Sequence, residues 1–181
     1  MENYLVILIT HLCNYLNDNN INYVIVGGIS VLAWGRSRTT EDIDFIIDHE
    51  KLDISDFVKY LKEKNFSADE SDFEGFLQKD HCTIFYKEGL FRIDIIGIYS
   101  LDNKISVNEA TEIGFHGINI KIDSPESLIA HKLNFGSQQD IEDAYSVLIR
   151  NKERINIKKL RNHSERLKVL NKLEKLLKSI D

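Results

Sequence analysis

The sequence contains only two cysteines and no long apolar run. No stretch approaches the roughly 20 apolar residues that a membrane-spanning helix needs, which argues against an integral membrane protein. The first residues, Met1 to Asn3, lack the basic start and the small-residue cleavage site of a secretory signal. Cys13 and Cys82 lie far apart among apolar neighbours, so we expect two reduced core thiols and not a disulfide. These features predict a cytoplasmic protein with no membrane partner.

Several common functional motifs are also missing. The chain has no glycine loop ending in Lys-Ser or Lys-Thr, no dinucleotide-binding Gly-x-Gly-x-x-Gly and no zinc-ligand spacing. There is no internal repeat and no low-complexity linker. The composition, 43% apolar and 29% charged, is that of an ordinary globular domain.

The net charge of −6 is unevenly distributed. Residues 150–178 contain eleven Lys or Arg but only three Glu, so the rest of the chain is strongly acidic. An acidic body does not suit nucleic-acid binding over the whole surface. The basic C-terminal segment could contact a phosphate backbone or an acidic partner, or it could simply be a solvated helix face.

Hydrophobic periodicity predicts helices and short strands in mixed order. The predicted helices are 4–17, 29–34, 54–64, one starting at Pro125, 140–148 and 165–180. The predicted strands are 21–26, 43–47, 82–86, 91–96 and 118–122. We therefore expect an α+β fold in which helices flank a mixed β-sheet and a C-terminal helical extension follows. We divide the chain into residues 1–123 and a helical segment 124–181 packed on them, as one compact unit.

Asp42 and Asp44 are the most informative pair of residues. Side chains alternate along a strand, so these two carboxylates point to one face while Ile43 and Phe45 point into the core. Two acids so close repel each other unless a cation neutralises them. Hard oxygen ligands of high charge suit Mg²⁺, which keeps several waters and shares its site with substrate phosphates.

Asp94 is a third acid, set in the apolar strand 91–96. An unpaired charge is rarely buried in such a run, because its desolvation costs too much. If this strand pairs beside residues 43–47, the three carboxylates converge and can hold two cations. The alternative is that Asp94 only forms an ion pair with Arg92 or a distant Lys.

Gly27 and Gly28 end a buried strand and open a helix. Free backbone N–H groups at a helix start can face an anion, and the missing side chains allow a triphosphate to approach closely. Ser30 could cap the short helix or line the phosphate pocket.

Together these motifs resemble the nucleotidyltransferase superfamily with the polymerase-beta-type palm. The resemblance covers roughly residues 21–148. It rests on hydrophobic–Gly–Gly, thirteen further residues, Asp–hydrophobic–Asp–hydrophobic, and a later hydrophobic–Asp–hydrophobic. The segment Arg38-x-Thr40-x-Asp42-Ile43-Asp44 is similar to small prokaryotic members, namely minimal antitoxin-like and abortive-infection-type nucleotidyltransferases.

This resemblance implies a nucleotidyltransferase-like palm in residues 1–123. It also implies two Mg²⁺ ions, with Mn²⁺ as a substitute, held by three catalytic acids. ATP or another nucleoside triphosphate would donate a nucleoside monophosphate group, with release of pyrophosphate. By position, Gly27 and Gly28 would hold the triphosphate, while Arg38 and Thr40 would support it or position the strand.

A second segment, Ser124 to Leu133, resembles the same relatives. Lys132 stands where the family often has a lysine and could reach nucleotide phosphates. Asp140 and Asp143 match an Asp-x-x-Asp that follows in relatives, but this chain has Ser137-Gln138-Gln139 where many relatives have basic residues. The alternative for Lys132 and the two acids is a salt bridge between helices, with N-capping.

The leading hypothesis is therefore an enzyme of the nucleotidyltransferase class. Its acceptor would be a hydroxyl of a protein, of an RNA 3′ end or of a small molecule, in a setting that could be a toxin–antitoxin pair. The alternative is a non-catalytic palm that acts as an antitoxin-like interaction subunit or as a nucleotide sensor. The sequence does not identify the acceptor, the preferred base or the oligomeric state.

Overall fold

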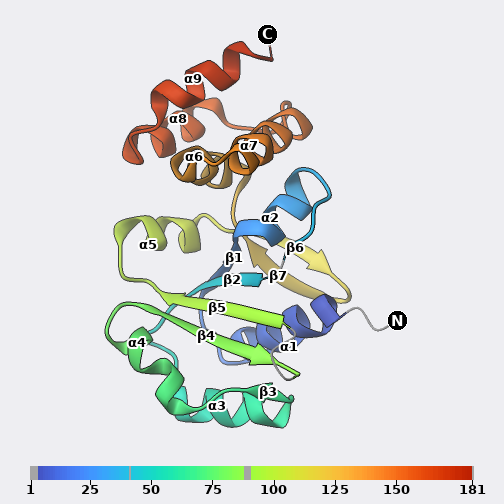
Figure 1. The fold of residues 1–181 in the computed structure, drawn as a ribbon, viewed down its shortest axis with the longest axis vertical. Helices are drawn as coiled ribbons and strands as arrows, with labels where there is room; N and C mark the ends of the chain where they lie inside the picture. The colour runs from blue at the N-terminus through green and yellow to red at the C-terminus, as the bar shows by residue number, and fades with distance from the viewer. Residues whose placement is uncertain (1–3, 41, 88–90, 181) are drawn as a thin grey trace. The chain divides into compact units, whose positions relative to one another are not determined.

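A computed structural model of the protein describes residues 4–40, 42–87 and 91–180 (Figure 1). The strands are β1 (Tyr23–Val26), β2 (Asp42–Ile47), β3 (Phe66–Ser67), β4 (His81–Tyr86), β5 (Phe91–Gly97), β6 (Thr111–Phe115) and β7 (Ile118–Ile122). The helices are α1 (Tyr4–Asp18), α2 (Gly27–Trp34), α3 (Ile54–Glu63), α4 (Glu74–Leu77), α5 (Leu101–Asn108), α6 (Pro125–Phe135), α7 (Gln138–Arg150), α8 (Ile157–Arg166) and α9 (Leu170–Lys178), with a 3-10 turn at Glu70–Phe73. Among the described residues, no helix has both the length and the hydrophobicity to cross a bilayer.

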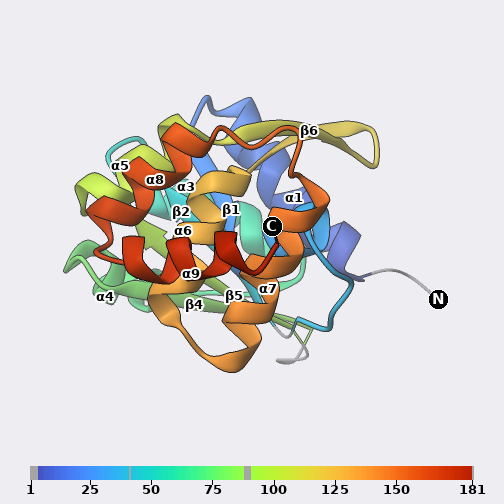
Figure 2. The same ribbon diagram turned by 90° about the horizontal axis from the view of Figure 1, so that it is seen from above.

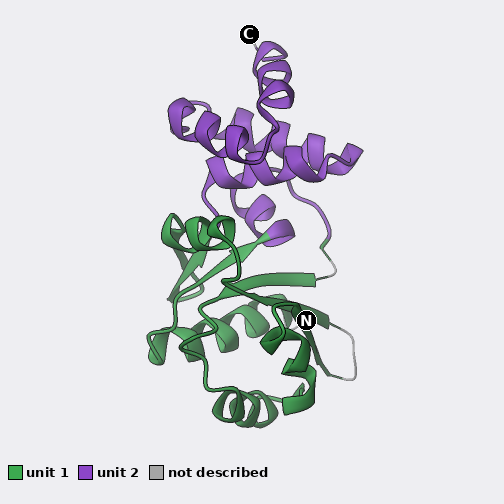
Figure 3. Cartoon of the chain, turned by 90° about the vertical axis from the view of Figure 1, so that its left-hand side faces the viewer, with its two compact units in different colours: residues 1–26, 40–122 green, residues 27–39, 123–181 purple. Residues whose placement is uncertain are grey.

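The chain divides into two compact units, coloured separately in Figure 3. Unit 1 comprises residues 1–26 and 40–122 and holds the sheet. Unit 2 comprises residues 27–39 and 123–181 and holds α2 with the four C-terminal helices. The division after residue 123 that the sequence suggests stays a prediction.

Unit 1 is built on a mixed seven-stranded sheet in the order β3-β4-β5-β2-β1-β7-β6. The pairs β2–β5 and β1–β7 are parallel, and the other neighbours are antiparallel. This mixed sheet with its helices confirms the predicted α+β class.

One face of the sheet is the core of unit 1. Ile43, Phe45 and Ile47 of β2 alternate onto this face and are at most 2% exposed. Phe45 packs on Tyr23 of β1, with ring centroids 6.1 Å apart. Helices α1 and α3 meet at a ring contact of 4.8 Å between Tyr15 and Phe57. The predicted inward side of β2 is therefore confirmed.

The opposite face of the sheet is only partly covered. Helix α5 packs on it through Val107, which forms a small buried cluster with Val24 and Ile46. Asp42 and Asp44 lie on the same face as Ile46, toward the start of β2, and are only partly buried. The polar end of this strand thus keeps access to solvent.

Unit 2 has its own core, formed mainly by residues of α2 and of α6 to α9. Figure 2 shows helices α6 to α9 from above. Its fully buried members include Val31 of α2 and Leu128 and Leu133 of α6. Helix α6 begins as the sequence predicts: the Ser124 side chain accepts a hydrogen bond from the backbone N–H of Ser127, and Pro125 occupies the first turn.

The prediction of one last helix over 165–180 is wrong. Helix α8 ends at Arg166, and α9 starts at Leu170. Lys168 between them has a φ of 59°, and the Val169 N–H donates to the Ser164 carbonyl, which closes α8 with a turn. The leucine pattern is real, since Leu173 and Leu176 are buried, but it does not show where the backbone turns.

Both cysteines are free and buried, as expected. Burial raises the pKa of each thiol to about 12, so at a pH of about 8 almost no reactive thiolate is present. We expect iodoacetamide to leave Cys13 and Cys82 unmodified in the native protein and to alkylate both in urea, as measured by intact mass. Rapid native labelling of either thiol would contradict this burial.

Candidate active site

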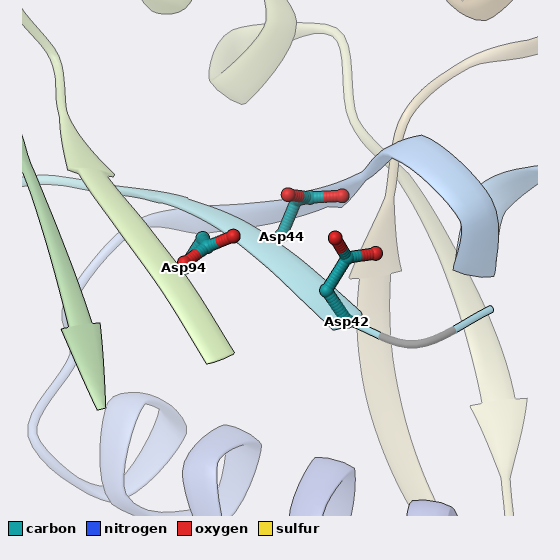
Figure 4. A group of neighbouring side chains, drawn as sticks. All are labelled: Asp42, Asp44 and Asp94. Atoms are coloured by element: carbon teal, nitrogen blue, oxygen red, sulfur yellow. The ribbon is translucent and has the colours of Figure 1, made fainter. Parts of the chain in front are cut away.

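The three predicted acids gather on one face of the sheet in unit 1. Asp42 and Asp44 lie on β2, and Asp94 lies on the neighbouring β5 (Figure 4). One carboxylate oxygen from each comes within 4.8 Å of the others, and all three side chains are partly buried. The predicted convergence depended on the strand of Asp94 pairing beside residues 43–47, and β5 does pair with β2.

Strand register brings the acids together. Strands β2 and β5 pair in parallel, with Asp44 directly opposite Asp94 and Asp42 opposite Arg92. Directly opposite residues in a sheet point to the same face, so carboxylates far apart in the sequence become neighbours. The apolar residues between them, Ile43 and Ile93, point into the core and fix this register.

Neighbouring polar groups orient the carboxylates. The Thr83 hydroxyl on β4 donates to Oδ1 of Asp94 at 2.7 Å. The Thr40 hydroxyl donates to the Asp42 carbonyl at 3.1 Å and lies 3.4 Å from its Oδ1. Thr40, which was predicted, therefore contacts the strand that bears Asp42 and Asp44. Thr83, which contacts Asp94, was not predicted from the sequence.

Arg92 bridges two of the acids. Its Nη2 lies 2.6 Å from Oδ2 of Asp42, and its Nε lies 3.0 Å from Oδ2 of Asp94. The pKa of Arg92 is raised above its ordinary value. The larger cause is the negative charge of Asp94, and the hydrogen bond to Asp42 adds to it. The Arg92–Asp94 ion pair that the sequence left open is thus present, in addition to the convergence of the acids.

The donor set suits a divalent cation. Three carboxylates face one another, and the Arg92 guanidinium pairs with two of them. Carboxylate oxygens on one open face are the ligands that Mg²⁺ or Mn²⁺ takes together with substrate oxygens. The residues therefore fit a hard divalent metal.

The predicted glycine pair begins α2 in unit 2. Gly27 has a φ of 66°, in the left-handed region where glycine is favoured, and Gly28 is buried. Ser30 is fully buried within the same helix. The roles of these residues in nucleotide binding stay predictions.

Two other predicted nucleotide-binding residues, Arg38 and Lys132, meet at one carboxylate. Nη1 of Arg38 lies 2.7 Å from Oδ2 of Asp143, and Nζ of Lys132 lies 3.5 Å from the same oxygen. Arg36, which was not predicted, contacts Oδ1 of Asp143 at 2.9 Å through its Nε. The alternation Arg36-x-Arg38 is the sequence feature that could have indicated it.

Asp140 links α6 and α7. Its Oδ1 accepts from Nζ of Lys132 at 2.9 Å, and its Oδ2 accepts from the backbone N–H of Ser137 in a capping box. Burial opposes ionisation here, but the hydrogen bonds from Lys132 and Ser137 outweigh it and lower the pKa of Asp140. The helix-to-helix salt bridge considered from the sequence is therefore present.

Solved structures similar to this chain carry the same fold. An antigenic nucleotidyltransferase-like protein from Paracoccidioides brasiliensis is 24% identical, with a TM-score of 0.59 over 96% of this chain and 92% of that one. ANT(2″)-Ia in complex with adenylyl-2″-tobramycin is 15% identical, with a TM-score of 0.61 over 91% and 97%. The lincomycin-bound lincosamide antibiotic adenylyltransferase LnuA is 16% identical, with a TM-score of 0.51 over 76% and 94%.

No curated protein matches the sequence. A family described as "Nucleotidyl transferase of unknown function" matches residues 7–178, which is nearly the whole chain. The three acids, the mixed sheet and this match agree with one another. The chain belongs to that nucleotidyl transferase family and is an enzyme of the nucleotidyltransferase class.

Proposed function

We propose that this nucleotidyltransferase uses Mg²⁺, as two ions that Mn²⁺ can replace, at Asp42, Asp44 and Asp94. ATP or another nucleoside triphosphate would supply the nucleoside monophosphate group to an acceptor hydroxyl, with release of pyrophosphate. The observation that carries the proposal is the convergence of three carboxylates within 4.8 Å on one partly exposed face.

The bound metal would supply charge neutralisation at the attacking oxygen and at the leaving pyrophosphate. Asp42 and Asp44, which share β2, would hold both ions. Asp94, oriented by the Thr83 hydroxyl, would complete the ligand set and accept the proton of the acceptor hydroxyl. Such chemistry needs positioning and electrostatic stabilisation more than further reactive groups.

Two observations bear on the acceptor, and each supports a different class of molecule. The names of two similar structures refer to antibiotic ligands, adenylyl-2″-tobramycin and lincomycin, which supports a small-molecule hydroxyl. The eleven basic residues of 150–178 support a macromolecule such as a protein or an RNA 3′ end, and a toxin–antitoxin pair would supply one. We therefore propose a test that does not presume the acceptor.

The test incubates the protein with each α-labelled triphosphate, Mg²⁺ or Mn²⁺, and three separate acceptor pools: cell RNA, cell protein and small-molecule extract. We expect label to enter one pool in a metal-dependent manner, with an equal amount of pyrophosphate formed. A reaction without divalent metal is the control. Absence of labelling and of pyrophosphate in every pool would count against catalysis.

The rival is a palm that serves only as a scaffold, and a specific observation favours it. Ser137 and Gln138, in place of basic residues, are used within α7: Ser137 caps the helix and Gln138 donates to Glu142 at 3.0 Å. Calorimetry with Mg²⁺ and each of the four triphosphates separates the two proposals. An enzyme should bind at least one triphosphate only when metal is present, whereas a scaffold should bind none.

Arg92→Gln is expected to tighten Mn²⁺ binding about threefold to tenfold. The guanidinium occupies Oδ2 of both Asp42 and Asp94, so a metal that uses these oxygens must displace it. The Arg92 side chain is half exposed, which keeps the expected gain small. Titration monitored by calorimetry or by the Mn²⁺ electron spin signal measures the change. Weaker binding in the variant would mean that Arg92 orients the acids and does not compete with the metal.

A further inference from the structure

The sheet of unit 1 ends in two unequal edge strands (Figure 1). One edge is β3, which has only two residues, Phe66 and Ser67. The other edge is β6, Thr111–Phe115, and within the described residues its one strand neighbour is β7. An edge strand presents a row of unpaired N–H and C=O groups, and a very short edge is one way to prevent pairing there. The β3 edge has that protection and the β6 edge does not.

Strand β6 also lacks the other features that protect an edge. It contains no proline and no lysine, and its one charged residue is Glu112. All five residues pair with β7 in one continuous register, which starts at Thr111 opposite Ile122, so no bulge turns the strand away. The β6 edge is therefore regular enough to accept another strand.

The tight turn between β6 and β7 determines which backbone groups of β6 point outward. Its residues, 116–117, both have positive φ, so Phe115 and Ile118 form the hydrogen-bonded pair that closes the hairpin. Hydrogen-bonded and non-hydrogen-bonded pairs then alternate along the two strands. The N–H and C=O groups of Glu112 and Gly114 therefore point away from β7, toward the edge.

Strand β7 agrees with this alternation. Asn119 lies opposite Gly114, and its C=O accepts a hydrogen bond at 3.0 Å from the side chain of Asn17 on α1. The backbone of Asn119 is thus turned away from β6, as expected in a non-hydrogen-bonded pair. On β6, both Glu112 and Gly114 are exposed. Two residues at the edge therefore offer donors and acceptors to a further strand.

The side chains on the other face of β6 are mostly apolar and only partly buried. Ile113 lies opposite the buried Ile120 of β7, so both point to the same face of the sheet. Phe115 follows two residues later on that face and is also only partly buried. A further strand beside β6 would remove more of this apolar surface from water, which favours association.

The sequence of β6 complements itself in one antiparallel register. When Ile113 faces Ile113 of a second copy, all five residues of each strand are paired. Glu112 then lies opposite Gly114 of the second copy, so the two carboxylates do not face each other. A register that pairs Glu112 with Glu112 would shorten the contact and set like charges directly opposite. The occupant that this edge fits is therefore a second copy of the chain.

We propose that two copies of the chain associate through their β6 edges, antiparallel about Ile113, and so join two seven-stranded sheets into one. Backbone hydrogen bonds at Glu112 and Gly114 give the contact its direction. Ile113 and Phe115 supply its apolar part. Pairing of five-residue strands is small for a specific interface, so the dimer should be weak, with a Kd on the order of 10–100 µM. Association at this edge involves unit 1 and requires no nucleotidyl transfer.

Sedimentation equilibrium of the full chain, from about 5 to about 500 µM, measures this association. We expect a reversible monomer–dimer equilibrium with a Kd in the stated range. Amide hydrogen exchange read by NMR should show protection of Glu112 and Gly114 only where the dimer forms, whereas Ile113 should be protected at every concentration. A chain that stays monomeric throughout overturns the proposal, even if a strand of another protein occupies the edge.

Gly114→Glu and Gly114→Lys place opposite charges at the same exposed position. A carbon added at Gly114 meets no non-neighbouring atom of the described chain within 4 Å, so both side chains have room. Facing Glu112 of the second copy, the introduced glutamate should raise Kd about threefold to tenfold, and the introduced lysine should lower it by a similar factor. Both variants lose the same glycine, so a change in backbone freedom affects them alike. Equal Kd values in the two variants overturn the proposal.

A double variant, Glu112→Lys with Gly114→Glu, tests the register itself. Each introduced lysine then faces an introduced glutamate of the other copy, so Kd should return to within about threefold of that of Gly114→Lys. A double variant that associates as weakly as Gly114→Glu overturns the proposal.

Ser67→Glu is the matched control, because it adds the same charge at an exposed position of the β3 edge. It should leave Kd as in the wild type. A rise equal to that in Gly114→Glu would assign the effect to net charge and overturn the proposal. If circular dichroism shows that Gly114→Glu does not fold, Gly114→Lys is compared with the wild type, and association that is unchanged or weaker overturns the proposal.

Discussion

Asp44→Asn should lower nucleotidyl transfer at least about 10³-fold, because the site loses the central ligand of its three acids. The fold should survive. Asp44 lies directly opposite Asp94 in the sheet, so removing one of two facing negative charges relieves repulsion in the metal-free protein. We expect a melting temperature equal to or slightly above that of the wild type, measured beside the transfer of labelled nucleotide.

Asp48→Asn provides the control for that experiment. Asp48 directly follows β2 and lies outside the three acids. Its side chain is 18% exposed and forms an ion pair with Lys51 at 3.8 Å. Its replacement should leave the transfer rate within about twofold of the wild type, as expected for a position away from the acids. If Asp44→Asn retained activity while properly folded, the assignment of the metal site would be wrong.

The second large effect is expected one residue further along the same strand. Phe45→Ala should destabilise the protein by about 3–5 kcal/mol, because Phe45 is 1% exposed and its loss leaves a cavity against Tyr23. For a chain of this size the melting temperature should fall on the order of 10 °C. Calorimetric or circular-dichroism melting measures the change.

Phe85→Ala is the counterpart on an exposed position of β4, where the residue is 39% exposed. Folding removes less apolar area from water at this position than at Phe45. The free energy of unfolding should therefore fall by less than about 1.5 kcal/mol. Equal destabilisation by the two substitutions would mean that the core face of β2 is assigned incorrectly.

The sequence predicts the elements whose pattern of apolar and polar residues lies within one short segment. The apolar runs of β1, β2 and β5 were identified because buried strands are nearly continuous in branched residues. Alternation then placed Asp42 and Asp44 on one face without knowledge of the neighbours. Asp94 required only the further assumption that its strand lies beside β2.

The sequence did not reveal elements that depend on tertiary packing. Helix α5 and strand β6 were missed because each buries few side chains, and α8 because its sequence is largely polar. The contact of Arg36 with Asp143 joins residues 107 positions apart. The alternation Arg36-x-Arg38 could have indicated the arginine, but not its partner Asp143, since only the folded backbone brings the two charges together.

The two sides of β2 carry separate tasks, since the acids face outward and the aromatic and branched residues face inward. A substitution on β2 can therefore remove the catalytic activity without affecting the stability of the fold, or the reverse. Replacement of one of these aspartates by asparagine should yield a catalytically inactive but well-folded chain that still presents the same surfaces to a partner. Descendants of this sequence could thus pass from enzyme to binding protein without an unstable intermediate.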